Sequence, residues 1–143
     1  MSSEPNNAVR TYLMSRGCAP HVVRRGLAGL LEQWSAIVQQ AERGRDASLD
    51  EWLNDMDLRD ILAGALAAAN PRERRAAAPR LDDADERYLA ITEISPSLWG
   101  DEIATTNDWR PEWQWWYFRR PILPGPLLRE DLLVNGLLSG EKR

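Results

Sequence analysis

Apolar residues recur at helical spacing over most of the first ninety positions of this chain. The longest such stripe begins after Pro20 and stops at Gly44, and it predicts one long amphipathic helix between them. Its members are Val23, Leu27, Leu30, Leu31, Trp34, Ile37, Val38 and Ala41. Gly26 and Gly29 fall inside this helix, where each costs about 1 kcal/mol relative to Ala. Either a neighbouring helix or the C-terminal tryptophans approach closely there, or the two glycines are merely tolerated.

A shorter helix precedes the long one. Ser3 is placed to cap it, Val9, Tyr12 and Leu13 recur at helical spacing, and Gly17 ends it. This segment reads as a packing helix.

The segment from Ser48 to Leu66 begins with a capping box. Ser48 and Glu51 are spaced so that each side chain satisfies a backbone N–H group of the other. The apolar residues that follow fall on two stripes that are out of phase. We therefore expect a break near residues 54–57, with Asp57 capping the second piece.

A second capping signal combines Asn70, Pro71 at the first helical position, and Glu73. Pro79 is expected to end or restart this helix. Another amphipathic stretch then runs from Leu81 to Ile91 and is closed by the Ser95–Pro96 pair. Its outer face is expected to carry Asp82, Asp83, Glu86 and Arg87.

The periodicity fails after Pro96, and a Trp-rich segment occupies residues 109–121. Residues 98–103 suggest one short helical turn, and Asp108 is placed to cap another near Pro111. Residues 115–120 are crowded with aromatic rings and read as extended chain. Alternation in an extended run puts Trp113, Trp115 and Tyr117 on one face and Trp116 and Phe118 on the other. Residues 124–126 make a stiff bend before a Leu-rich stretch that is either a docked helix or an interaction tail.

These elements predict an all-α fold of five or six helices in a small bundle, with the Trp-rich segment packed across it. Residues 1–121 form the expected helical domain, and residues 122–143 form a Leu-rich tail or docking helix. No strand partner is apparent, so the pattern does not require a sheet.

Composition supports one packed domain outside the membrane. The chain has 143 residues, of which 43% are hydrophobic and 28% charged, close to globular averages. No stretch approaches the roughly 20 apolar residues of a membrane span, and the first residues contain no apolar signal segment. Cys18 is the single cysteine, which excludes an intramolecular disulfide. A cytoplasmic location is expected.

Charge is unevenly distributed along the chain. Residues 1–45 carry six Arg against three Glu, residues 46–108 carry six Arg against fifteen Asp and Glu, and residues 109–143 carry six basic against four acidic side chains. An acidic centre disfavours nucleic acid, which requires a basic face. A basic protein partner is expected instead.

Four groups of residues carry the resemblance of this chain to other proteins. They are the run from Leu53 to Arg59, Tyr88-Leu89, Leu98-Trp99-Gly100 and the run from Trp115 to Pro121. In this spacing, over roughly residues 10–121, the chain resembles small uncharacterised bacterial proteins of similar length. The resemblance implies no catalytic residues.

No catalytic or metal-binding constellation is apparent. Cys18 and His21 hold the only thiol and the only imidazole, too few groups for a zinc site or a cysteine catalyst. Phosphate-binding loops, GxSxG elbows and HExxH helices do not occur in the sequence. We therefore expect a non-enzymatic protein without cofactor or metal.

The leading hypothesis is a protein-binding module that neutralises a basic partner through an acidic helical face, as an immunity protein, antitoxin or anti-defence protein would. The residues expected to bind that partner are Asp50, Asp55, Asp57, Asp82, Asp83 and Glu86.

Two alternatives remain open. One is a ligand-binding or enzymatic pocket lined by Trp99, Trp113 and Trp116 and charged by Arg119 and Arg120, although these arginines are expected to pair with the acidic centre of the chain itself. The other is an adaptor subunit or a homo-oligomer that docks through residues 122–143.

Overall fold

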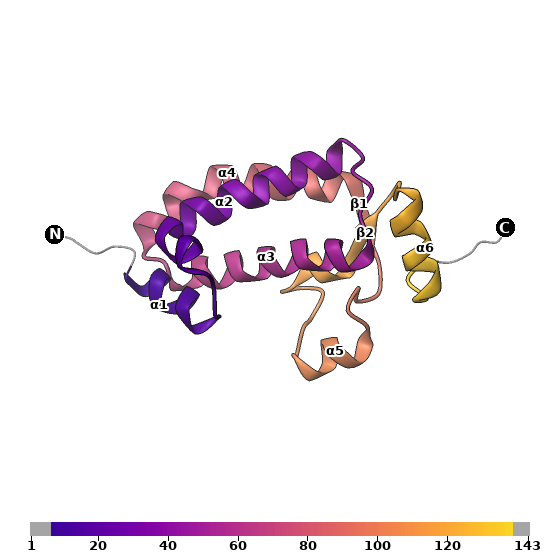
Figure 1. The fold of residues 1–143 in the computed structure, drawn as a ribbon. Coiled ribbons are helices and arrows are strands. Elements are labelled where there is room, and N and C mark those ends of the chain that lie inside the picture. The colour runs from indigo at the N-terminus through magenta and orange to yellow at the C-terminus, as the bar shows by residue number, and fades with distance from the viewer. Residues whose placement is uncertain (1–6, 139–143) are drawn as a thin grey trace.

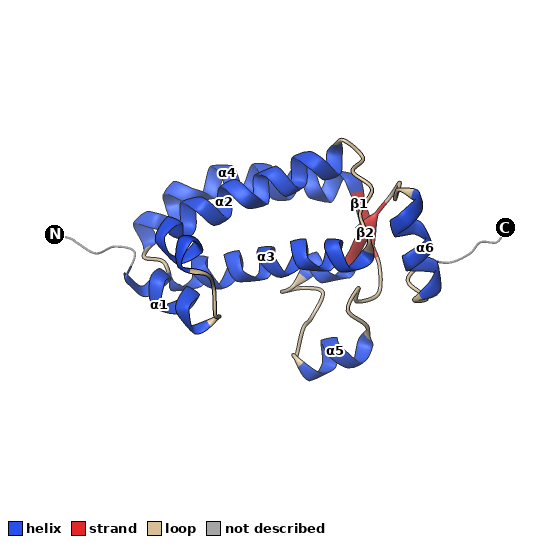
Figure 2. Ribbon diagram, in the orientation of Figure 1, coloured by secondary structure: helices blue, strands red, loops and turns tan. Residues whose placement is uncertain are grey.

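The computed structural model describes residues 7–138 and shows a helical bundle (Figure 1). The described residues form six α-helices, one 3₁₀ helix and one two-stranded sheet (Figure 2), so the predicted all-α class is confirmed. In chain order the elements are α1 (Asn7–Ser15), α2 (Pro20–Glu42), α3 (Leu49–Ala68), α4 (Pro71–Ile91), β1 (Thr92–Ile94), α5 (Asp101–Thr106), η1 (Trp115–Phe118), β2 (Arg119–Pro121) and α6 (Pro126–Val134). None of the described helices is long and apolar enough to cross a membrane.

The three long helices α2, α3 and α4 form the body of the bundle, with α2 packed along both of the others (Figure 1). Helix α1 packs across one end of α2 and α3, and the β1–β2 sheet and α6 lie at the other end (Figure 1). Trp34 of α2, Met56 of α3 and Tyr88 of α4 are fully buried between the helices. Large aromatic side chains therefore fill the space that the three helices enclose.

Helix α2 is kinked at Gly26, whose backbone has φ of 60° and ψ of −147°. That conformation is essentially restricted to glycine. A methyl group on Gly26 would meet no atom within 4 Å, while one on Gly29 would lie 2.5 Å from Cβ of Arg25, one turn back in the same helix. Close approach of the C-terminal tryptophans is therefore wrong as the reason for either glycine.

Helix α3 is continuous from Leu49 to Ala68, so the break expected at residues 54–57 is wrong. Its two apolar stripes need no interruption because α3 is surrounded by α1, α2, η1 and α6. One stripe buries Trp52 and Met56, and the other buries Leu62 and Ala65.

Both predicted capping boxes are confirmed. The Glu51 backbone N–H donates to Ser48 Oγ at 3.1 Å, and the Ser48 N–H donates to Glu51 Oε1 at 2.9 Å. Asn70 and Glu73 make the same pair of bonds at 2.8 and 3.0 Å. Helix α4 continues through Pro79, contrary to the expected stop, and the ring of Pro79 lies on the exposed side of the helix.

The Trp-rich segment is only partly extended. Residues 115–118 form η1, and only the following residues form a strand, β2, which pairs antiparallel with β1 with Glu93 opposite Arg120. The expected division of alternate rings between two faces is therefore wrong. Backbone N–H groups of Ser95 and Leu98 donate to the carbonyls of Phe118 and Tyr117, both at 2.8 Å, and hold η1 in place.

Helix α6 is docked onto the start of α3 by two hydrogen bonds, in each of which a carboxylate of one segment accepts from a backbone N–H group of the other. Asp46, just before α3, accepts from the backbone N–H of Leu127 at 3.1 Å. In return, Asp131 of α6 accepts from the N–H of Leu49 at 2.9 Å. Leu128 and Leu132 are the buried side chains of α6. Ser3, the expected cap of the first helix, lies outside the described residues.

The kink predicts a specific cost for a side chain at residue 26. Gly26→Ala should lower the free energy of unfolding by about 1–3 kcal/mol, because alanine is strained in that backbone conformation. Gly26→Asn should cost a similar amount, since asparagine tolerates the left-handed helical region but not this one. Urea unfolding followed by circular dichroism measures both, with Ala36→Gly in the regular part of α2 as the control for helix propensity. If the Gly26→Ala variant proved as stable as the wild type, the proposal that residue 26 has a strained backbone conformation would be contradicted.

Candidate functional site

The most deeply buried charge in the described chain is the guanidinium of Arg59, on the inner side of α3. Its Nε and Nη2 donate to the two carboxylate oxygens of Asp85 in α4, at 3.1 and 2.8 Å. The Arg59 side chain is 6% exposed and that of Asp85 17%. Two parallel bonds of this kind fix orientation as well as charge, so the pair sets how α3 faces α4.

Three tryptophans surround this ion pair. The guanidinium carbon of Arg59 lies 4.6 Å from the ring centroid of Trp116, 5.4 Å from that of Trp115 and 5.8 Å from that of Trp34. Trp34 also donates from Nε1 to Oδ1 of Asp85 at 2.9 Å. The rings replace water around the cation with aromatic faces, which attract it. We call Arg59, Asp85, Trp34, Trp115 and Trp116 the arginine cage.

A second anchor for the Trp-rich segment is Asp57, two residues before Arg59 in α3. Tyr117 donates its hydroxyl to Oδ1 of Asp57 at 2.6 Å, and Trp99 donates Nε1 to the same oxygen at 3.2 Å. The ring of Trp109 stacks on Tyr117, with centroids 4.0 Å apart. Burial, followed by the hydrogen bond to Asp57, raises the pKa of the Tyr117 phenol above its usual range. Asp57 therefore anchors aromatic side chains of its own chain.

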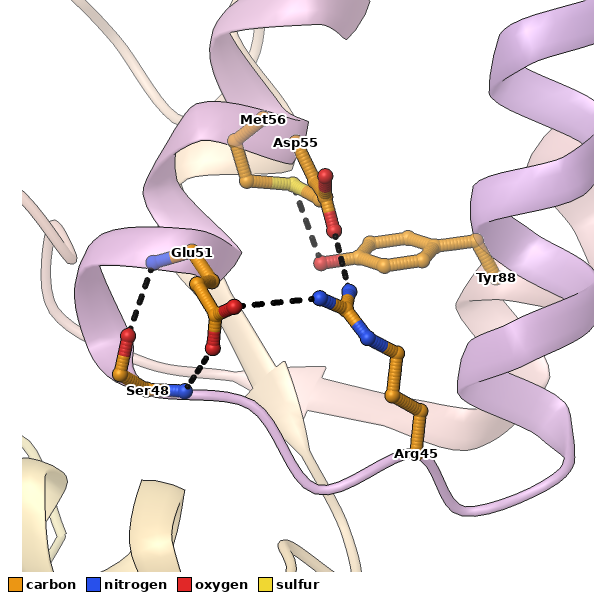
Figure 3. Close-up of polar contacts among 6 residues, drawn as sticks. All are labelled: Arg45, Ser48, Glu51, Asp55, Met56 and Tyr88. Carbon is orange, nitrogen blue, oxygen red and sulfur yellow. Dashed lines mark hydrogen bonds and ion pairs between the residues drawn. The ribbon is translucent and has the colours of Figure 1, made fainter.

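Figure 3 shows the polar contacts at the start of α3. Arg45 reaches Glu51 at 3.4 Å and Asp55 at 3.5 Å, while Tyr88 donates its hydroxyl to the sulfur of Met56 at 3.2 Å. Burial raises the pKa of the Asp55 carboxyl, Arg45 opposes that shift, and Glu51 adds to it. Asp55 is half-buried and paired, so little of its charge is offered to a partner.

Arg119 and Arg120 both bind groups of their own chain. Arg119 donates from Nε to Oγ1 of Thr92 at 2.9 Å and from Nη2 to the Thr92 carbonyl at 2.8 Å, at the C-terminal end of α4. Arg120 donates from Nε to Glu93 at 2.9 Å and from Nη1 to the carbonyl of Leu137 at 2.6 Å. These two arginines hold β2 and α6 against α4.

The three tryptophans proposed for a ligand pocket lie in different environments. Trp116 is 4% exposed inside the arginine cage, Trp113 is 71% exposed, and Trp99 is half-buried against Asp57. The structure therefore does not bring these rings and the two arginines together around one open pocket.

The acidic residues proposed for partner binding separate into buried and exposed groups. Asp55 and Asp57 face their own chain, as described above. Asp50, Asp82 and Glu86 are exposed and make no ion pair within the described residues. Asp83 is bound to Arg87 at 3.1 Å, although its side chain is 67% exposed.

A further feature is a hollow of about 300 Å³ at the end of the bundle where α2 and α4 finish. Its apolar lining includes Ala41, Trp52, Ala90, Ile91, Ile122, Leu123, Pro124 and Leu128. Glu42 and Arg45 are the charged residues in its lining.

Within residues 7–138, no group of three or more His, Cys, Asp or Glu side chains is placed to hold a metal ion. Cys18 is half-buried and His21 is exposed, at the junction of α1 and α2. No chemistry is assigned to either residue.

Sequence reasoning missed Arg59 and Asp85. A signal for Arg59 was present, because it lies between apolar residues in a helix that is buried on several sides. A signal for Asp85 was its position three residues before Tyr88, on the inner stripe of α4.

Comparisons with models of known protein families, with curated proteins and with solved structures found no match to this chain. The site is therefore interpreted from its own residues.

The arginine cage predicts that removing Arg59 alone lowers the free energy of unfolding more than removing Arg59 and Asp85 together. Arg59→Leu should lower the free energy of unfolding by about 3–5 kcal/mol, because Asp85 is left buried without its partner. The double variant Arg59→Leu/Asp85→Leu should lose less than Arg59→Leu alone, since no charge remains unpaired. Urea unfolding followed by tryptophan fluorescence measures both.

The control for the cage is the exposed pair of Arg25 and Glu32, where Arg25→Ala should leave the free energy of unfolding near that of the wild type. A double cage variant that is less stable than Arg59→Leu would show that Asp85 does not need the arginine charge.

Asp60 predicts a pH dependence of stability. Burial raises the pKa of its carboxyl, nearby Arg16 at 3.5 Å opposes the shift, and the charge of Asp57 adds to it. The folded state therefore holds the Asp60 proton more tightly than the unfolded state, so this group contributes less stability as pH rises above its ordinary pKa of about 3.9. Asp60→Asn should weaken that decline, whereas Asp60→Glu should keep it. Unfolding measured at several pH values tests both, and equal slopes for wild type and Asp60→Asn would contradict the assignment.

Proposed function

We propose that this protein is a non-enzymatic, cytoplasmic protein-binding module that neutralises a basic partner through the exposed acidic surface of α4. The observation that carries the proposal is that Asp82 and Glu86 lie one turn apart on α4, exposed and without an ion pair among the described residues. Unpaired exposed carboxylates keep their charge available to an approaching partner. Such fields increase association rates more than they increase final affinity.

The composition of the surface beside these acids supports a protein partner. Helical spacing continues the line of Asp82 and Glu86 to Pro79 on one side and Leu89 on the other, and both of these residues are exposed. Polar groups beside partly exposed apolar side chains are typical of protein interfaces. We call Pro79, Asp82, Asp83, Glu86 and Leu89 the acidic stripe.

Charge along α4 limits the acidic stripe to one half of the helix. Residues 71–80 carry four arginines and one glutamate, whereas residues 81–91 carry four acidic residues and one arginine. Asp85, one of those four, is paired with Arg59 inside the bundle. A basic partner is therefore expected to bind the C-terminal half of α4. The exposed Asp50 at the start of α3 is a further candidate contact.

Immunity proteins, antitoxins and anti-defence proteins act by neutralising a partner, and one of these roles is the proposed biological setting. The alternative of a small-ligand or enzymatic pocket at Trp99, Trp113 and Trp116 has weaker support, because Arg119 and Arg120 are already bound to Thr92, Glu93 and Leu137.

Charge reversal tests the acidic stripe. A partner is captured from the host with the tagged full chain, and its affinity is then measured by calorimetry. Asp82→Lys/Glu86→Lys should weaken binding more than tenfold at low salt, because two attractive charges become repulsive. The loss should shrink as salt is raised.

The matched control is Asp101→Lys/Glu102→Lys, which reverses two exposed acids on α5 and should leave the affinity near wild type. Failure to capture a basic protein, or equal affinities for the stripe variant and the wild type, would refute the proposal.

A further inference from the structure

Exposed apolar side chains gather at one end of the bundle. Among residues 7–138, ten large hydrophobic side chains are substantially exposed, and six of them lie in β1, in the segment after β2, or in α6. These elements lie together beyond the ends of the long helices (Figure 1). The six side chains, which we call the terminal apolar surface, are Ile94, Ile122, Leu123, Leu127, Leu133 and Val134. Exposed apolar groups gathered in one region mark binding surfaces.

The same region contains both a projection and a hollow. Leu123 is 89% exposed in a short segment between Pro121 and Pro124, whose fixed φ angles limit its freedom. It also lines the hollow of about 300 Å³, together with Trp52, Ile91 and Leu128. An isologous dimer requires that one surface carry both a projecting group and a recess that can receive it.

Charge at the hollow favours an identical partner. Its charged lining residues are Glu42 and Arg45, one of each sign. Both are already paired within the chain, Glu42 with Arg87 at 2.5 Å and Arg45 with Glu51 at 3.4 Å. Two copies therefore meet here without like-charge repulsion, whereas two acidic stripes would repel each other.

The six exposed side chains supply a large part of the area that a dimer interface needs. A stable interface buries about 800 Å² on each partner. Because burial of one aliphatic side chain removes on the order of 100 Å² from water, the six partly exposed side chains supply about half of that area. The lining of the hollow and the flanking prolines add to it.

Few large apolar side chains of the sequence lie outside the described residues. Residues 1–6 contain one, Met1, and residues 139–143 contain none.

We propose that two copies of this protein associate through their terminal apolar surfaces, with Leu123 of each copy inserted into the hollow of the other. The dimer is isologous, so each single substitution removes two equivalent contacts. This inference does not rest on the acidic stripe, whose residues Asp82 and Glu86 do not line the hollow.

Sedimentation velocity of the full chain over a range of concentrations tests the dimer. The wild type should shift from the mass of one chain to that of two as concentration rises. Leu123→Glu should raise the dissociation constant at least about a hundredfold, because both copies lose a buried leucine and gain a charge. Ala90→Trp, which fills the hollow without changing the projection, should also give monomers.

Met14→Glu is the matched control, since Met14 is 65% exposed on α1 at the opposite end and its variant should dimerise normally. Circular dichroism checks that each variant is folded, and Leu123→Glu is expected to fold because its side chain contacts solvent. A wild type that stays monomeric at every concentration overturns the proposal, as does a dimer that Leu123→Glu and Ala90→Trp leave intact. A monomeric wild type whose Leu123→Glu variant loses a captured partner would assign the surface to a different protein.

Discussion

The ion pair between Arg59 and Asp85 lies where α2, α3, α4 and η1 meet, and the arrangement of the Trp-rich segment follows from it. Removing two charges from water is unfavourable unless each finds close partners. Asp85 is satisfied by Arg59 and Trp34, but Nη1 of the Arg59 guanidinium is buried without a hydrogen-bond partner. The aromatic faces of Trp115 and Trp116 compensate in part, because they attract a cation without accepting a directional hydrogen bond. The tryptophans of η1 thus serve as a cover for a buried cation.

The rest of the C-terminal third depends on that cover. Once η1 lies across α3, Tyr117 reaches Asp57 and the next residues run alongside β1. Arg119 can then bind the last carbonyl groups of α4, and Arg120 can bind Glu93 and the chain after α6. Two carboxylates fix α6 against the start of α3. Asp46 accepts from a backbone N–H group of α6, and Asp131 accepts from a backbone N–H group of α3. Each contact brings the next residues within reach, so a fault at the arginine cage is expected to affect residues far along the chain.

Local signals made the helices predictable, and tertiary contacts decided what local signals could not. The two capping boxes and the stripe of α2 follow from spacing alone, because the partner groups are three or four residues apart. The uninterrupted course of α3 was not predictable, since its two out-of-phase apolar stripes are buried by four different neighbouring elements. The 3₁₀ turn at residues 115–118 was missed for a related reason. Aromatic residues favour extended chain locally, but here their contacts with Arg59, a buried cation in another helix, set the backbone conformation.

Gly26 was noted in the sequence as a residue that disfavours a helix. Its backbone conformation, and therefore the kink in α2, could not be inferred from its position. Of the proposed site, Asp82, Asp83 and Glu86 were identified from the sequence as an outer face. The inner position of Asp85 was overlooked, and the contacts of Asp57 with Trp99 and Tyr117 depend on residues more than forty positions away.

That distinction matters because charge counted along a sequence overstates the charge that a surface displays. Residues 46–108 have an excess of nine acidic side chains, but Asp57 and Asp85 are held inside, Asp46 binds backbone N–H groups of α6, and Asp55 is half-buried beside Arg45. The exposed acids that remain are the acidic stripe on α4, Asp50 and the acids in and after α5. The two proposals rest on the acidic stripe and, on separate residues, on the terminal apolar surface. The two surfaces have different physical properties, since charge acts over about 8–10 Å at physiological salt while apolar burial acts only on contact. A protein that uses both can attract one partner electrostatically at the acidic stripe while a contact-dependent apolar interface at the end of the bundle holds a second copy, and neither surface competes with the other for the same side chains.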